Sequence, residues 1–229
     1  MASQLLGLIR QLIWNDFKGK PSAADLAKMQ QIAANASSGT VGMAMTASDF
    51  TVSYGGSRPG EPVLTADPGG STYSLADTIT ITVVFDPMKS WAQTGPLTTS
   101  GSQFLLDHEQ GHYDLTALMA RDCFIDLMQL KAKSYAAAAD GQKEAKDIFQ
   151  KYHDKLNPVQ DKYDWETTHG AWVTPSMGPE RKASDQVRWE GFVQTAFTSD
   201  RPSGGSSPSD GKSYKVRILD VLAKGGFVF

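Results

Sequence analysis

Residues 103–133 read QFLLDHEQGHYDLTALMARDCFIDLMQLKAK, and this stretch decides how the rest of the chain is interpreted. It contains no proline and a single glycine, Gly111, and is rich in Leu, Ala, Met, Gln and Asp. Its apolar residues recur at helical spacing, and two histidines continue the same face. The stretch therefore predicts a long amphipathic helix. The predicted stripe consists of Leu105, His108, His112, Leu115, Met119 and Cys123.

Within this helix, residues 108–112 read HEQGH and fit the H-E-x-x-H pattern of zinc metallopeptidases. His108 and His112 stand one above the other on a helix face, so both imidazoles can reach one metal ion. Glu109, between them, is placed to deprotonate a water bound to that ion. The alternative is a pair of core histidines that find other partners, since buried imidazoles without a partner cost free energy.

A catalytic zinc ion usually takes three protein ligands and leaves one position for water. The histidines outside the motif are His153 and His169. His153 lies in a second helical stretch, from about residue 141 to 163, where we expect it at the surface or at a rim. Pro158 interrupts that stretch, so we expect a kink or a break near Asn157.

Three blocks of sequence follow one another along the chain: LIWNDFKGKP at residues 12–21, HEQGHYD at 108–114 and YDWETTHG at 163–170. In this order they resemble a bacterial family of predicted secreted zinc-dependent proteases that is catalogued mainly as a domain of unknown function. The resemblance implies a zincin-type metallopeptidase whose helix carries two zinc histidines. It also implies a protein that works outside the cytoplasm.

The third zinc ligand is open between two residues of the last block. His169 is too far from His112 to share its helix, so it must come from another element. Imidazole is the commoner zinc ligand, and a carboxylate often orients a ligating imidazole. We therefore expect His169 to bind zinc with Asp164 as its orienter. Asp164 as the ligand is the open alternative, and Asp164 and Thr167 could instead only close a turn. Tyr163 is a candidate oxyanion donor or, equally, a packing residue.

These residues predict a zinc-dependent peptidase with one Zn²⁺ per chain and a peptide or protein substrate. A water activated by the metal would lose its proton to Glu109 and attack the peptide carbonyl. The alternative function is a zinc-containing binding module, or inactive pseudo-peptidase, that recognises a protein or peptide without cleaving it. A structural zinc site is a third interpretation. Such sites have four protein ligands, often including cysteine, and Cys123 lies three turns from His112.

The other segments predict an α+β fold of the zincin type, in which a small twisted sheet packs on the metal-binding helix and on the second helix. Residues 77–85 alternate Thr with Ile and predict a strand. This strand either lies at an edge, where it would bind extended substrate, or lies in the interior. Residues 50–54 predict a weaker strand. Residues 22–35 and 183–197 predict helices.

We expect residues 1–198 to form the zincin-like metallopeptidase domain. Residues 199–212 are rich in Ser, Gly and Pro and predict a flexible linker or exposed loop. The hydrophobic tail, residues 213–229, is expected to dock on the domain as a β segment. Its two strands would be residues 214–222 and 226–229.

The composition excludes several functional classes. The 229 residues carry a net charge of −3, which gives no footprint for nucleic acid or for an anionic membrane. The apolar-leaning residues 5–14 are interrupted by Arg10 and Gln11, so we expect neither a membrane span nor a signal peptide. A single cysteine excludes an intrachain disulfide. Location outside the cytoplasm thus rests on the resemblance, a cytoplasmic location is the alternative, and the sequence does not indicate an oligomeric state.

Overall fold

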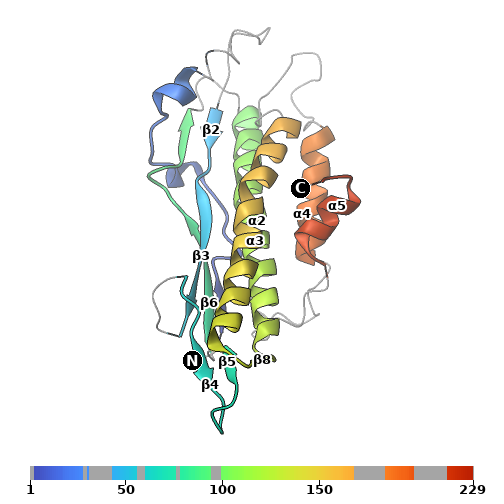
Figure 1. The fold of residues 1–229 in the computed structure, drawn as a ribbon. Helices are drawn as coiled ribbons and strands as arrows, with labels where there is room; N and C mark the ends of the chain where they lie inside the picture. Colours follow the sequence, from blue (N-terminus) through green and yellow to red (C-terminus); the bar gives the residue numbers. More distant parts are fainter. Residues whose placement is uncertain are drawn as a thin grey trace.

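The computed structural model describes residues 3–27, 30, 43–55, 60–75, 78–93, 99–167, 184–198 and 216–228. Its elements lie in three layers (Figure 1): strands on one side, two long helices in the middle, and two shorter helices on the other side. The long helices are α2 (Thr99–Leu130) and α3 (Ala138–Thr167), and the shorter ones are α4 (Ser184–Thr198) and α5 (Ile218–Lys224). The α+β class expected from the sequence is confirmed.

The main sheet has the strand order β1-β6-β3. β6 (Ile79–Phe85) lies in the centre, with β1 (Gln4–Leu6) parallel to it and β3 (Ser48–Tyr54) antiparallel. Alternate side chains of β3 and β6 enter the core, as the two-residue period of a strand requires. Because β6 has a strand on each side, it is not an edge strand. The interior interpretation is confirmed, and the edge interpretation is wrong.

Two smaller sheets lie at opposite ends of the long helices (Figure 1). At one end, β2 (Met43–Met45) pairs antiparallel with β7 (Trp91–Gln93). At the other end, β4 (Leu64–Ala66), β5 (Tyr73–Leu75) and β8 (Ser134–Tyr135) form an antiparallel sheet. Within the described parts of the chain, β2 has a strand partner on one side only.

Helix α2 is the centre of the fold. Every residue from Leu115 to Ile125 is buried, because the sheet, α3, α4 and α5 all contact this helix. The sequence predicted one apolar face, whereas this half of the helix is enclosed on all sides. The half that carries residues 108–112 has a more open surface, with Gln110 and Gly111 only half-buried.

Helix α3 runs through Pro158 without the break expected near Asn157. Proline removes one backbone hydrogen bond from a helix and crowds the preceding turn. Here both Asn157 and Pro158 are exposed, so water can solvate the carbonyl that loses its partner. The opposite face of α3 packs on α2 along its length. This packing keeps the two halves of α3 in one helix.

The C-terminal segment forms helix α5, so the predicted strand pair is wrong. Ile218, Val221 and Leu222 are buried at the spacing i, i+3 and i+4 of a helix face. Gly226 has a φ of 91°, which ends the helix. Phe227 then packs against Trp189 of α4, with ring centroids 4.9 Å apart. Residues 218–227 thus pack on α2 and α4.

A buried ion pair on α2 holds this segment in place. Arg121 contacts Asp122 at 2.8 Å, and both side chains are fully buried. Arg121 also donates hydrogen bonds to the carbonyls of Ala196 and Val216, while Asp122 accepts one from the backbone of Ile218. The pair thus joins α2 to the end of α4 and the start of α5.

The remaining expectations concern shorter segments. Helix α4 confirms the helix expected at residues 183–197. Residues 23–27 are helical, and a short 3₁₀ helix, η1, spans Trp14–Asp16. The linker expected at residues 199–212 lies outside the described residues. Among the helices that the structure describes, none combines the length and apolarity needed to cross a membrane.

Candidate metal centre

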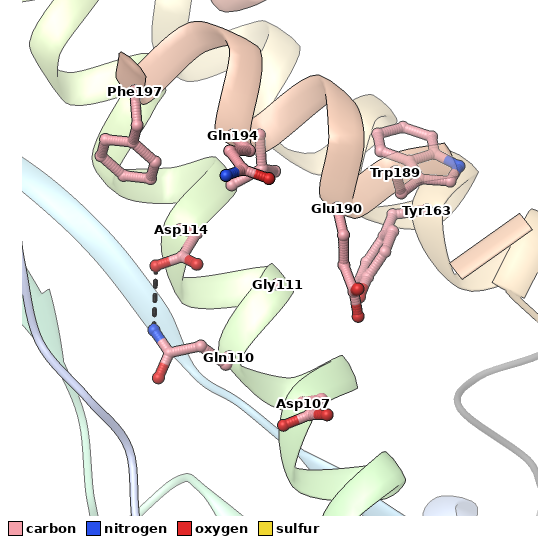
Figure 2. A pocket seen from close by; sticks show the side chains of 10 residues that line it. Asp107, Gln110, Gly111, Asp114, Tyr163, Trp189, Glu190, Gln194 and Phe197 are labelled. Atoms are coloured by element: carbon pink, nitrogen blue, oxygen red, sulfur yellow. Dashed lines mark hydrogen bonds between the residues drawn. The ribbon is translucent and has the colours of Figure 1, made fainter. Parts of the chain in front are cut away.

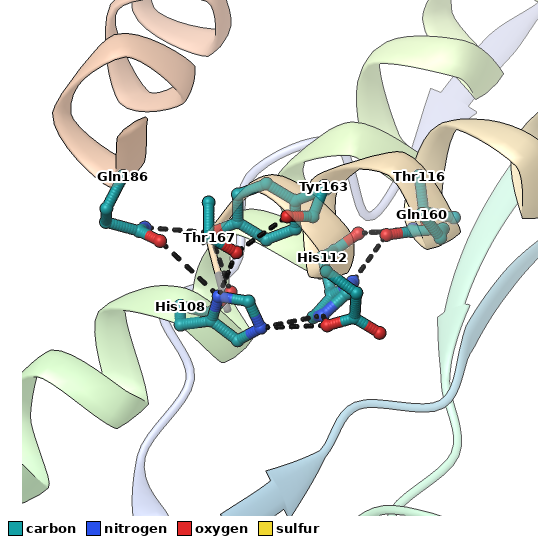
Figure 3. Close-up of polar contacts among 8 residues, drawn as sticks. His108, His112, Thr116, Gln160, Tyr163, Thr167 and Gln186 are labelled. Atoms are coloured by element: carbon teal, nitrogen blue, oxygen red, sulfur yellow. Dashed lines mark hydrogen bonds and ion pairs between the residues drawn. The ribbon is translucent and has the colours of Figure 1, made fainter. Parts of the chain in front are cut away.

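Three side chains from two helices converge on one point beside α2 (Figure 3). Nε2 of His112 lies 3.1 Å from Nε2 of His108. Oδ1 of Asp164, from α3, lies 3.2 Å from Nε2 of His108 and 3.1 Å from Nε2 of His112. The three atoms therefore form a nearly equilateral triangle. The predicted pairing of the two histidines is found, and Asp164 takes the third corner.

The proton on the His112 ring can be assigned from its neighbours. Gln160 of α3 donates from Nε2 to the carbonyl of His112 at 2.9 Å, which fixes the orientation of its amide. Its Oε1 then faces Nδ1 of His112 at 2.5 Å. An amide oxygen can only accept, so Nδ1 carries the proton and Nε2 keeps its lone pair.

The same assignment holds for His108. Its Nδ1 lies 3.2 Å from Oγ1 of Thr167 and 3.4 Å from Oε1 of Gln186. Thr167 donates its own proton to the carbonyl of Tyr163, and Gln186 donates from Nε2 to the Tyr163 hydroxyl. Both oxygens are thus free to accept from Nδ1 of His108. Its Nε2 is left bare, pointing at the other two corners of the triangle.

Three electron-pair acceptors this close repel one another unless a cation lies between them. Burial lowers the pKa of His112, but its hydrogen bond with Asp164 and the charge of Glu109 raise it more, to about 9. The site therefore favours positive charge strongly. A proton can bridge one pair of these atoms, whereas a metal ion reaches all three. Tetrahedral ligands 2.0–2.1 Å from zinc lie about 3.3 Å apart, close to the spacing found here. The residues fit a bound metal.

Glu109 stands beside this triangle. Only 1 % of the residue is exposed, and no described residue hydrogen-bonds its Oε2. Its charge acts on both His112 and Tyr163, raising the pKa of each. A buried carboxylate oxygen without a partner is costly unless water or a ligand meets it. The unpartnered oxygen of Glu109 is therefore a polar atom that a bound water or ligand could meet.

Tyr163 packs against His108. Its ring stacks on the ring of His108, with centroids 4.7 Å apart and planes 10° apart. Its hydroxyl donates to the carbonyl of His108 at 3.2 Å and accepts from Gln186, and burial raises its pKa well above the ordinary value. The hydroxyl is therefore engaged with these two groups. The position favours the packing interpretation of Tyr163 over that of an oxyanion donor.

A cleft of about 370 Å³ opens beside the triangle, and both His112 and Asp164 line it. One wall is formed by α3 and the other by residues 43–48, which comprise β2, the two residues after it and the first residue of β3. The side chain of His108 is 1 % exposed, whereas that of Asp164 is 28 % exposed. A metal ion at the triangle would therefore be reached from the Asp164 side, through this cleft.

One protein family has a sequence pattern that matches residues 14–170, and it is described as a bacterial protein of unknown function, DUF922. The chain belongs to the DUF922 family. The DUF922 region includes the triangle, Glu109 and His169, whereas α4 and α5 follow it. No curated protein and no solved structure matches the chain.

Position 111 of the HEQGH sequence in this DUF922 protein has room for glycine only. A Cβ atom at this position would lie 2.2 Å from the hydroxyl oxygen of Tyr163. That hydroxyl cannot move without losing its bond to the backbone of His108. We therefore expect Gly111→Ala to lower the free energy of unfolding by about 1–3 kcal/mol, as overpacking does. Urea unfolding monitored by circular dichroism would measure the change.

Gly191→Ala is the matched control, because Gly191 also lies inside a helix, α4. A Cβ atom there meets nothing within 4 Å. Helix propensity alone then applies and raises the free energy of unfolding by up to about 1 kcal/mol. Equal effects of the two substitutions would contradict the role given to Tyr163.

Sequence reasoning missed the residues that fix the two imidazoles. Gln160 precedes Asp164 by one helical turn, so the i, i+4 spacing could have suggested it once Asp164 was considered a ligand. Gln186 comes from α4, and no spacing indicates that it reaches His108. His169 lies outside the described residues. His153 is at the surface, as expected, with Nε2 3.6 Å from Oδ1 of Asp49.

A second hollow, of about 360 Å³, lies on another side of α2, between α2 and α4 (Figure 2). Asp107, Asp114 and Glu190 stand around it, above an apolar floor that includes Trp189 and Phe197. Burial raises the pKa of Asp114 to about 6. None of the three corners of the triangle lines this hollow. The cleft beside Asp164 is thus the one that serves the metal centre.

Proposed function

We propose that this DUF922 protein is a zinc-dependent peptidase with Glu109 as its general base. One observation carries the proposal: three electron-pair acceptors lie 3.1–3.2 Å apart next to a buried carboxylate that has an oxygen without a described partner. Either feature alone could serve a structural site. Together they match what metal-assisted hydrolysis needs, a cation position and an adjacent proton acceptor.

His108, His112 and Asp164 would hold the ion. A zinc ion bound there would lower the pKa of its water and polarise a carbonyl. Glu109 receives the proton of the attacking water and returns it to the leaving amine. Gln160, Thr167 and Gln186 keep both Nδ1 atoms protonated, so that each Nε2 offers its lone pair. Cys123 is buried and is not part of the described ligand cluster, which argues against a four-ligand structural site.

The shape of the cleft favours a polypeptide substrate. Six consecutive residues, 43–48, line it. Side chains on a strand alternate between two faces, so consecutive lining residues imply that the backbone edge itself faces the cleft. An extended peptide could add to this edge as a further strand. We therefore assign to β2 the binding of extended substrate that the sequence suggested for residues 77–85.

Hydrolysis of an unfolded protein tests the proposal directly. We expect the zinc-loaded protein to cleave a reduced, alkylated protein substrate into peptides detectable by mass spectrometry. A chelator should stop cleavage by removing the cation that His108, His112 and Asp164 hold, and stoichiometric zinc should restore it. Cleavage that persists at full rate in metal-free protein would refute the assignment.

A further inference from the structure

Resting on the proposed peptidase function, we propose that the cleft selects extended polypeptide segments that carry a lysine or arginine next to the bond to be cleaved. The cleft is acidic: Asp25 and Asp161 line it in addition to Asp164. No lysine or arginine occurs among the described residues that line it. A cationic side chain would thus meet only negative charge there.

Asp25 and Asp161 come from two different elements that line the cleft. Asp161 lies on α3, about one turn before Asp164, is exposed and has no ion-pair partner among the residues that the structure describes. Asp25 belongs to the short helix at residues 23–27, where its Oδ2 accepts hydrogen bonds from Ser22. Because Oδ1 of Asp25 makes none of these bonds, it can accept from an ammonium or guanidinium group.

The walls of the cleft suit the aliphatic part of such a side chain. Met43 and Leu156 are buried and line the cleft, and Met45 lies beside them with 37 % of its surface exposed. Lysine and arginine pack their methylene stems on apolar surface while the charged end stays at a polar rim. A cleft lined by both apolar side chains and carboxylates therefore matches both parts of one basic side chain.

A second, independent observation indicates that a ligand belongs in this cleft. Trp91 of β7 lines it and is only 3 % exposed, yet its Nε1 has no hydrogen-bond acceptor among the described residues. Oγ1 of Thr46, directly after β2, is buried and also has no hydrogen-bond partner within the part of the chain that the structure describes. A peptide backbone that adds to β2 carries carbonyl and N–H groups that can satisfy such atoms. An isolated cation could not satisfy an N–H donor.

The acidic pair is not a second metal site. Among the described residues, the only group of three or more His, Cys, Asp or Glu side chains close enough to share an ion is His108, His112 and Asp164. Asp25 and Asp161 are outside that group, so the cationic partner that we infer for them is carried by a larger group. The side chain of a bound peptide is such a group.

Three short blocked peptides that differ at one position test the selectivity, with lysine, its uncharged isostere norleucine, or glutamate at that position. We expect the zinc-loaded wild type to cleave the lysine peptide with a kcat/KM about five- to tenfold above that of the norleucine peptide. Asp161→Asn should bring this ratio towards one, and Asp161→Lys should favour the glutamate peptide. A reversal of preference reports charge, which a loss of structure would not produce.

Asp154→Asn is the matched control, because Asp154 is exposed on the same helix, does not line the cleft and changes the net charge equally. It should keep the wild-type ratio. Equal kcat/KM values for the three peptides in the wild type would overturn the inference and leave the peptidase function standing.

Binding to zinc-loaded Glu109→Gln, measured by fluorescence anisotropy of the labelled peptides, separates the two proposals. Tighter binding of the lysine peptide that is lost in Glu109→Gln/Asp161→Asn supports the inference. If the lysine peptide binds in this way but the wild type cleaves no peptide, the proposed peptidase function is wrong and the inferred selectivity still holds. Equal binding of the three peptides overturns the inference.

Discussion

Replacing Glu109 by glutamine should lower kcat by about 10²–10⁴-fold while the protein keeps one zinc ion per chain. Glutamine has the shape of glutamate but cannot accept a proton at neutral pH. Glu109 contributes none of the three atoms of the triangle, so the metal should stay. No described hydrogen bond to Oε2 is lost either, so the fold should survive the change. Zinc content by mass spectrometry and cleavage of an unfolded protein measure the two effects.

Glu61→Gln is the control, because Glu61 is exposed and lines neither the cleft beside Asp164 nor the hollow between α2 and α4. It should cleave at the wild-type rate. If the wild type and Glu109→Gln both bind zinc and are equally inert, the protein is a zinc-containing binding module instead. If both are equally active, another group accepts the proton and the assignment of Glu109 is wrong.

The parts of the site that the sequence predicts are those that depend on one helix. His108, Glu109 and His112 lie within a single turn and a half of α2, and the geometry of an α-helix alone fixes their relative positions. The strand at residues 79–85 can also be predicted from the sequence, because alternating β-branched residues indicate a strand wherever it lies in a sheet. Local periodicity thus identifies both the metal-binding helix and its supporting strand.

The third corner depends on how two helices pack, which no local pattern specifies. Asp164 and His169 are close in sequence, and chemistry alone favoured the imidazole. The packing of α3 against α2 places Oδ1 of Asp164 within 3.2 Å of Nε2 of both α2 histidines. His169 lies outside the described residues, so its role as a ligand with Asp164 as its orienter stays a prediction.

Two other features also depended on tertiary contacts. The C-terminal segment was expected to form strands, although Ile218, Val221 and Leu222 carry a helical spacing that packing on α2 selects. The sequence left open whether the strand at residues 79–85 lies at an edge, and β1, a strand of only three residues, places it in the interior. In both cases tertiary contacts decided between two patterns that the sequence permits.

Asp164→Ala should raise the dissociation constant for zinc by at least about 100-fold. Removing even an outer partner of a zinc ligand costs about 10–100-fold in affinity, and Asp164 stands in the position of a ligand itself. Its loss also removes the negative charge that holds a cation between His108 and His112. Competition with a chromophoric zinc chelator would measure the change, and Asp161→Ala, one turn earlier on α3, is the control with the same loss of charge.

His169→Ala is the variant that separates the two ligand assignments. Three protein ligands leave a catalytic zinc ion one open position, and the triangle already supplies three. We therefore expect His169→Ala to keep its zinc at wild-type affinity. The opposite result, with zinc lost from His169→Ala and retained by Asp164→Ala, would make the imidazole the ligand. Asp164 would then need to turn from Nε2 of the two α2 histidines towards His169, and the bare nitrogens would face each other without it.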